Sequence, residues 1–176
     1  TGLSRTRPFD CTAMRLERLE QEQILPVTVE RAWLFFSQPR NLAELTPPDA
    51  GFEMIRCPGG PVFEGAILEH RIRLAPLVRM RWVSEIKTVR ENDYFIDEQR
   101  AGPFRFWHHR HGFEAVEGGV RIRDVVHYAV GFGPLGVLAD RLFVRRQLEE
   151  LFAFRKAELA KRFTRVVPEP ARTAAS

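Results

Sequence analysis

The chain has 176 residues, 44% of them hydrophobic, and a net charge of +4 from 27 Lys and Arg against 23 Asp and Glu. This length suits one domain with a substantial core, and the interleaved charges exclude a long basic or acidic interaction tail. No apolar run approaches the ~20 residues of a membrane-spanning helix, so we expect no transmembrane segment.

The two cysteines and the N-terminus give expectations about cellular location. Cys11 and Cys57 are spaced unlike any metal or redox motif, and the first ten residues contain no apolar signal-peptide core. A reduced, cytoplasmic protein is the simpler interpretation, with a single disulfide as the alternative. Because the sequence shows no basic stripe, we also expect no nucleic-acid partner.

The first elements are predicted to be a strand and two short helices. An imperfect alternation over 14–26 favours a strand. Thr28 can cap a helix over 30–37, because a threonine side chain accepts a hydrogen bond from the first turn. A proline can open a second helix over 39–45, which the Pro47-Pro48 pair would stop.

Strand patterns dominate the middle of the chain. Short turns rich in Gly, Pro, Asn and Asp separate runs that alternate between apolar and polar residues. Six further strands are predicted, at 51–57, 66–74, 78–89, 94–100, 104–115 and 120–130. Their short connections favour an antiparallel meander.

A long helix over 135–163 follows the last strand, as its helical period indicates. Its apolar arc consists of Val144, Leu148, Leu151, Phe152, Leu159 and Phe163. Arg155 falls inside this arc, so its side chain should point toward the sheet or reach its edge. We therefore predict a single domain over 14–163, with an N-terminal extension over 1–13 and a C-terminal tail over 164–176.

The stretch DEQRAGPFRFWHHRHGF, residues 97–113, carries the most informative pattern in the chain. Two strands flank a Gly102-Pro103 turn, and successive side chains in a strand point to opposite faces. If odd positions pair with odd positions, one face collects Asp97, Gln99, Trp107, His109, His111 and Phe113. Polar groups on an otherwise apolar face are costly unless they pair with each other or serve a ligand.

Three interpretations of His109 and His111 remain open. Histidines two residues apart on one strand face can bind a metal, with Asp97 or Asp124 as third ligand, but no third ligand has diagnostic spacing. An imidazole oriented by an acid can also act as a general base. The third interpretation is a satisfied polar network that fixes strand pairing or binds the polar end of a ligand. Because no third ligand has diagnostic spacing, we predict no metal site, and we also predict no cofactor.

Arg155 is the best-placed cation for the acids on this face. A buried Asp97 or Asp124 needs a partner, and Arg155 projects from the apolar arc of the long helix. The alternative role for Arg155 is to bind a ligand carboxylate. The cost of an unpaired buried charge favours the structural pairing.

The order of elements resembles the helix-grip fold of the SRPBCC superfamily, which is START/Bet v 1-like. The resemblance covers about residues 14–163 and includes motifs similar to one bacterial polyketide cyclase/dehydrase-like subgroup. These motifs are AWLFF (32–36), PRNL (39–42), DEQ (97–99), GPF (102–104), WHHRH (107–111), FE (113–114), Asp124, Tyr128, GPLG (133–136) and FAFR (152–155). The resemblance implies an α+β helix-grip fold: a curved antiparallel seven-stranded sheet wrapped around a long C-terminal helix, with two short helices after the first strand.

The resemblance also implies a cavity between the sheet and the long helix. By strand parity, the candidate ligand-binding residues are His70, Trp82, Ser84, Asp97, Gln99, Trp107, His109, His111, Asp124, Tyr128, Phe152 and Arg155. Ile72, Met80, Val126 and Leu148 would complete the lining, and Phe35, Phe36 and Phe63 would stand at the mouth.

Two functions follow as expectations, since fold alone does not fix function. The first is a carrier or sensor that binds a small hydrophobic or amphipathic ligand, such as a lipid or polyketide-like compound. The alternative is a cyclase or dehydratase-type enzyme. In that enzyme His109 or His111 would be the general acid or base, oriented by Asp97 or Asp124, with Tyr128 as a possible donor. The oligomeric state stays open.

Overall fold

The computed structural model describes residues 15–75, 78–131 and 143–163. Its strands are β1 (Glu17–Leu25), β2 (Glu53–Arg56), β3 (Ile67–Ala75), β4 (Val78–Arg90), β5 (Tyr94–Ala101), β6 (Phe104–Val116) and β7 (Gly119–Val130). The expectations for residues 1–14 and 164–176, the GPLG motif at 133–136 and the first part of the predicted long helix, 135–142, lie outside the described residues.

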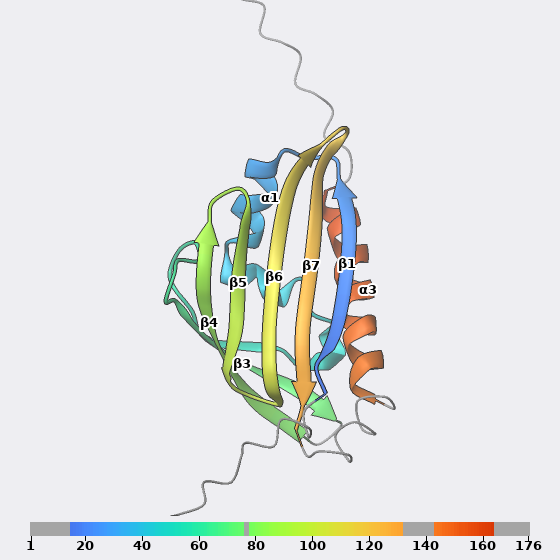
Figure 1. Cartoon of the computed structure of the whole chain (residues 1–176). Coiled ribbons are helices and arrows are strands. Elements are labelled where there is room, and N and C mark those ends of the chain that lie inside the picture. The colour runs from blue at the N-terminus through green and yellow to red at the C-terminus, as the bar shows by residue number, and fades with distance from the viewer. Residues whose placement is uncertain (1–14, 76–77, 132–142, 164–176) are drawn as a thin grey trace, which may run out of the picture.

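The seven strands form one antiparallel sheet in the order β1-β7-β6-β5-β4-β3-β2. The C-terminal helix α3 (Arg145–Arg162) and the short helix α1 (Val29–Phe36) both lie behind this curved sheet in Figure 1. Side-chain amides on β1 attach α3 to the sheet edge, since Gln21 and Gln23 donate hydrogen bonds to helix carbonyl oxygens of Phe152 and Lys156. The predicted helix-grip arrangement is confirmed.

The segment after β1 follows the predicted capping, with one correction. The Thr28 hydroxyl accepts a hydrogen bond from the backbone N–H of Arg31, which begins α1. The second short helix, η2 (Pro39–Ala43), is a 3₁₀ helix. It ends before the proline pair, as predicted, but a further 3₁₀ turn that was not predicted, η3 (Pro48–Ala50), begins at Pro48. Proline fits the first position of a helix, where its missing N–H would have no partner.

The β5–β6 hairpin has the register on which the odd-face prediction depends. Asp97 pairs with His109 and Phe95 pairs with His111, so odd positions meet odd positions. Gln99 closes the turn instead of extending the ladder. Its amide nitrogen lies 2.6 Å from the carbonyl oxygen of Phe104, and its amide oxygen accepts from the Phe104 N–H at 3.2 Å. A Cβ on Gly102 would collide with the Gln99 side chain, which explains the glycine.

We predict that Gln99→Ala lowers the free energy of unfolding by about 1–2 kcal/mol, because it leaves two backbone groups of Phe104 unpaired. Urea denaturation measures the loss. The matched control is Arg100→Ala, which removes an exposed side chain from the same strand and should stay close to wild type. Equal stabilities for the two variants would contradict a turn-closing role for Gln99.

The interior contains two apolar clusters with a polar layer between them. One cluster centres on Trp33, Phe95, Phe113 and Leu159, and the other on Trp82, Trp107, Tyr128 and Phe152. Along β6, β7 and α3, buried polar residues stand between apolar residues of the two clusters. The buried polar members between the clusters are His109 and His111 on β6, Asp124 on β7 and Arg155 on α3. The sheet therefore carries a buried charged layer at a single level.

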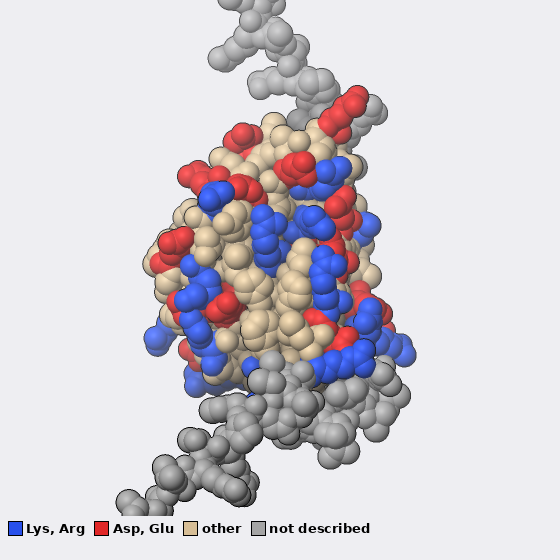
Figure 2. All heavy atoms as spheres, in the orientation of Figure 1, with Lys and Arg blue, Asp and Glu red and all other residues tan. Residues whose placement is uncertain are grey.

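The outer face of the sheet, seen in Figure 2, carries acidic and basic side chains side by side. Several basic residues of this face are paired with acids: Arg81 with Glu69 at 2.7 Å, Arg121 with Glu114 at 2.8 Å, and Arg123 with Glu20. Such exposed pairs contribute little to stability. Among the described residues, no helix is both long and apolar enough to span a bilayer.

Candidate functional site

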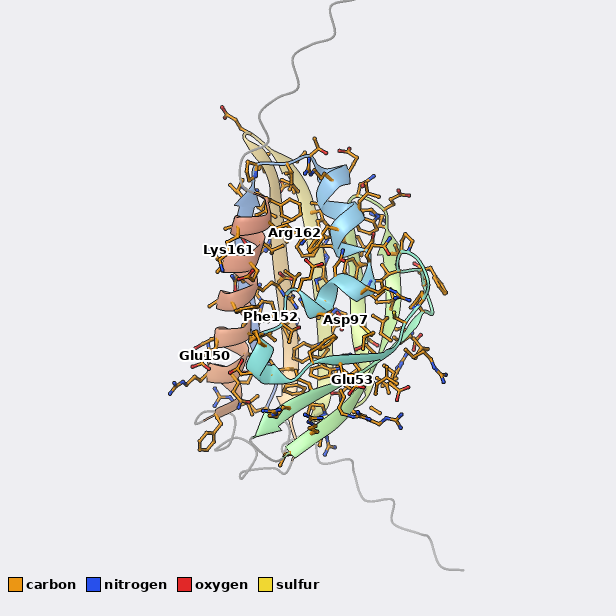
Figure 3. The ribbon with its side chains drawn as sticks, turned by 180° about the vertical axis from the view of Figure 1, so that it is seen from behind. Glu53, Asp97, Glu150, Phe152, Lys161 and Arg162 are labelled. Atoms are coloured by element: carbon orange, nitrogen blue, oxygen red, sulfur yellow. The ribbon has the colours of Figure 1, made fainter. Side chains whose placement is uncertain are left out.

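A cavity of about 1210 Å³ lies between the sheet, α3 and the short helices. Aromatic side chains from β4, β5 and β6 form much of its wall, including Trp82, Phe95, Phe104 and Trp107. The cavity reaches the surface where exposed residues such as Asp49 border it. In Figure 3, Asp97 lies toward the middle of the molecule and Phe152 lies on the side of α3 that faces it.

Two carboxylates and two imidazoles form a ring in the polar layer. Asp124 Oδ1 lies 2.8 Å from His109 Nε2 and 2.9 Å from His111 Nδ1, although only the His109 contact has hydrogen-bond alignment. Asp97 Oδ2 lies 3.0 Å from His111 Nε2 and 3.5 Å from His109 Nδ1. The two imidazole rings are 3.7 Å apart between centroids. Each imidazole therefore stands between both carboxylates.

Aromatic neighbours hold this ring in place. Trp107 donates its indole N–H to Asp97 Oδ1 at 3.3 Å, which leaves Oδ2 of the same carboxylate toward the imidazoles. Phe95 stacks on His111 with centroids 4.2 Å apart, and Phe152 meets His109 edge-on at 5.7 Å. Such packing fixes the ring orientations, so the polar groups are preorganised.

The surroundings of the two aspartates lower both of their pKa values. Burial acts to raise the pKa of Asp124, but the hydrogen bond from His109, the close contact of His111 and the charges of both imidazoles outweigh it and hold that pKa well below its usual range. Burial is likewise outweighed at Asp97, whose pKa is lowered by the His111 hydrogen bond and both imidazole charges. Both acids are therefore ionised at neutral pH.

The pKa of His109 is lowered, whereas the pKa of His111 is raised. Burial lowers the pKa of His109, helped by the charge of its neighbour His111, and the carboxylates offset this only in part. At His111 burial also acts to lower the pKa, but the close contact with Asp124 and the hydrogen bond to Asp97 outweigh it and raise that pKa. As pH falls, His111 is therefore the first of the two imidazoles to take up a proton.

Arg155 reaches the layer from α3, as predicted. Its side chain is 8% exposed, and its nearest acid contact is Nη1 to Asp124 Oδ1 at 3.9 Å. Its guanidinium lies 5.0 Å from the Phe152 ring centroid, and its Nε has no hydrogen-bond partner among the described residues. Arg155 also lines the cavity. The geometry thus allows the charge pairing and leaves donor capacity toward the cavity.

His70 forms a second polar point on the wall. Its ring lies between Phe52, at 5.1 Å, and Trp82, at 5.5 Å. Burial lowers the pKa of His70 to about 4, with the charge of Asp97 acting in the opposite direction. Its Nδ1 is buried and has no hydrogen-bond partner among the described residues. His70 is therefore neutral at physiological pH.

The structure brings most of the predicted ligand-binding residues to the cavity wall. These are His70, Trp82, Ser84, Asp97, Trp107, His109, His111 and Arg155. Four predicted residues lie elsewhere. Gln99 closes the hairpin turn, Asp124 stands behind the imidazoles, and Tyr128 and Phe152 are buried in the apolar cluster of Trp82 and Trp107. Of the predicted mouth, Phe35 and Phe36 line the cavity, whereas Phe63 is exposed away from it.

Several lining residues were not predicted from the sequence. Ile86 and Phe95 continue the inward parity of Ser84 and Asp97, so alternation contained a signal for them. On α3, Leu151 of the predicted apolar arc and Phe154 beside the arc extend the wall. The residues contributed by η2, η3 and the turns around them had no such signal, because irregular backbone has no fixed period.

Three residues of the ring could hold a metal ion. One ligand atom from each of Asp97, His109 and His111 lies within 4.8 Å of the others. All three residues also line the cavity, whereas Asp124 does not. The arrangement therefore offers three chemical capacities: metal coordination, proton transfer by an imidazole oriented by a carboxylate, and recognition of a polar group on a ligand.

Comparisons with known proteins show the fold. No family model and no curated protein matches the sequence. Among solved structures, the protein TTHA0849 from Thermus thermophilus superposes with a TM-score of 0.64 at 20% identity, covering 84% of this chain and 97% of that one. A norcoclaurine synthase point mutant from Thalictrum flavum gives a TM-score of 0.59 at 15% identity, covering 86% and 98%. Ara h 8.0201 gives 0.56 at 18% identity, covering 84% and 99%. The chain therefore has a Bet v 1-like helix-grip fold.

Proposed function

We propose that this protein binds a small amphipathic molecule, of a lipid or polyketide-like kind, in the cavity between the sheet and α3, as a carrier or sensor. The observation that carries the proposal is the cavity itself, with a volume of about 1210 Å³. A well-packed protein interior leaves few voids larger than a water molecule, so a space of this size is suited to a ligand.

The wall of the cavity matches an amphipathic molecule. Its aromatic part would bury an apolar body. Three polar atoms of lining residues, His70 Nδ1, Trp82 Nε1 and Arg155 Nε, are buried and lack hydrogen-bond partners among the described residues. Buried polar atoms are normally hydrogen-bonded, so these three atoms support the binding of a ligand that carries polar groups. Arg155 adds a charge that suits a carboxylate.

Filling the cavity should block binding of an amphipathic probe. We expect Leu151→Trp, on the cavity wall, to weaken binding of 1-anilinonaphthalene-8-sulfonate by at least about tenfold, which corresponds to roughly 1.4 kcal/mol. Fluorescence titration of the folded protein gives the dissociation constants. The matched control is Leu34→Trp, an exposed position of α1 outside the cavity, which should bind like wild type. Equal affinities of the two variants would place the probe outside the cavity and count against the proposal.

A second candidate function is acid–base catalysis of the cyclase or dehydratase type. The observation that favours it is that both imidazoles line the cavity and each contacts a carboxylate. The norcoclaurine synthase among the similar structures is an enzyme on this fold. Extraction of wild type and of His109→Ala, followed by mass spectrometry, separates the two functions. The same intact ligand from both proteins supports a carrier, and conversion of a candidate substrate by wild type alone supports an enzyme.

A further inference from the structure

We propose that Asp97, His109 and His111 form a binding site for a divalent transition-metal ion of the Zn²⁺ class on the cavity wall, with Asp124 as the positioning residue behind it. Ligand spacing along the sequence is not diagnostic of a metal site here. The pairing of Asp97 with His109 across the β5–β6 hairpin places a third ligand next to the two histidines. The proposal stands whether or not the cavity binds an amphipathic ligand.

The three ligand atoms already lie at distances that suit a metal centre. Asp97 Oδ2 is 3.0 Å from His111 Nε2 and 3.5 Å from His109 Nδ1. In tetrahedral coordination, metal–ligand bonds of about 2.0–2.2 Å place neighbouring ligand atoms about 3.4 Å apart. Asp97 Oδ2 is therefore within a few tenths of an ångström of this separation from each imidazole nitrogen, and the ligand atoms of all three residues lie within 4.8 Å of one another. The two imidazoles and one carboxylate are a donor set that suits Zn²⁺, Fe²⁺ or Co²⁺.

The opposite nitrogens of both imidazoles meet one carboxylate oxygen. Asp124 Oδ1 lies 2.8 Å from His109 Nε2 and 2.9 Å from His111 Nδ1. Histidines that bind metals usually donate their other N–H to a carboxylate or carbonyl oxygen, which fixes the tautomer. A small rotation of the His111 ring would align its N–H with Asp124. Asp124 would then orient two ligands at once while standing off the cavity wall.

With those tautomers, the atoms that face Asp97 are electron-pair donors with no proton of their own. His109 Nδ1, His111 Nε2 and Asp97 Oδ2 would repel one another unless a proton or a cation lies among them. Trp107 donates its N–H to Asp97 Oδ1 and so leaves Oδ2 directed at the two nitrogens, where it can accept a proton or bind a cation. A divalent ion among these three atoms would satisfy all of them at once.

The cavity supplies the open side of the site. Asp97, His109 and His111 all line it, so a fourth position is accessible to water or to an oxygen of a bound molecule. Three protein ligands with one open position are typical of catalytic rather than structural zinc. With both imidazoles neutral, a divalent ion and Arg155 exceed the two carboxylates by one positive charge. The fourth ligand should therefore be anionic, such as a hydroxide or a carboxylate.

Metal binding by the untagged full chain tests the proposal after treatment with a chelator. We expect one Zn²⁺ per chain by isothermal titration calorimetry, and a visible absorption spectrum typical of four-coordinate Co²⁺ after Co²⁺ addition. His109→Gln and Asp97→Asn should each weaken Zn²⁺ binding by at least about 100-fold, and Asp124→Asn by about 10- to 100-fold, since supporting carboxylates have effects of this size. Circular dichroism reports whether each variant is folded.

The matched control is His108→Gln, which lies on the same strand but is turned to the other face, where it contacts Glu98 at 3.1 Å. This variant should bind Zn²⁺ like wild type. The proposal is overturned if wild type fails to bind Zn²⁺, or if His108→Gln loses binding while Asp97→Asn retains it. Should His109→Gln fail to fold, X-ray absorption of the Zn²⁺-loaded wild type decides the matter. Two imidazoles and oxygen ligands support the site, and any other ligand set contradicts it.

Discussion

Replacing Arg155 by methionine is expected to lower the free energy of unfolding by about 3–5 kcal/mol, which is the range for removing one partner of a buried charge cluster. Methionine keeps most of the apolar stem of Arg155 and removes the guanidinium that lies over the Phe152 ring, so the loss should come mainly from the charged group. Without Arg155, the carboxylates of Asp97 and Asp124 would lose a permanent positive charge of the polar layer. Their negative charge would then be less compensated between two apolar clusters, where solvation is weak.

Urea denaturation at neutral pH in the presence of EDTA measures this loss without any contribution from bound metal. The matched control is Arg146→Met on the same helix, where the exposed side chain pairs with Glu150 at 2.8 Å. This control should stay close to wild type. If Arg155→Met and Arg146→Met unfold at the same urea concentration, the positive charge of Arg155 is not needed in the layer.

A double variant separates charge balance from packing. Arg155→Met combined with Asp124→Asn removes one positive and one negative charge together. Replacing a buried ion pair by uncharged groups is often close to neutral, so the double variant should be more stable than Arg155→Met. Losses that simply add would show that Arg155 and Asp124 act independently across their 3.9 Å separation.

The sequence predicted the fold well because its signals were periodic. Alternation along β6 placed Trp107, His109, His111 and Phe113 on one face, and the structure buries all four. The helical period placed Arg155 among apolar residues, and it is buried on the inner side of α3. Where backbone is irregular, the period is lost. The 3₁₀ turn at Pro48 was therefore missed, and so was the part of the cavity wall that η2 and η3 supply.

The candidate site was harder to predict. Strand alternation predicts which face of the sheet a side chain occupies, but not whether the side chain reaches the cavity. Asp97 and Asp124 share the inward face, yet Asp97 lines the cavity and Asp124 lies behind the imidazoles. This difference arises from how two histidine rings fit between two carboxylates, which depends on side-chain packing. Gln99 belongs to the same predicted face, but its amide is hydrogen-bonded to the backbone of Phe104 after the turn. The ligand-binding and catalytic roles of all these residues stay predictions.

His70 should make the protein lose stability between pH 6.5 and pH 4. Its imidazole is packed between Phe52 and Trp82, and burial lowers its pKa from 6.5 to about 4. In this window the unfolded chain takes up a proton at His70 that the folded chain does not, so the free energy of unfolding falls as pH falls. The slope is about 1.4 kcal/mol per pH unit, which amounts to about 3 kcal/mol at pH 4. Below that pH both states are protonated, and this group contributes no further loss.

Urea denaturation of wild type and His70→Phe at pH 7, 6, 5 and 4.5 measures the contribution of this histidine. Phenylalanine keeps a flat ring between Phe52 and Trp82 but does not titrate, so the stability of the variant relative to wild type should rise steadily as pH falls. Trp82→Phe is the control, because it changes the same stack and leaves His70 in place. Its pH dependence should parallel wild type. If His70→Phe also parallels wild type, the imidazole takes up its proton at the same pH in the folded and unfolded chains, and the wall of the cavity is more polar than its aromatic packing indicates.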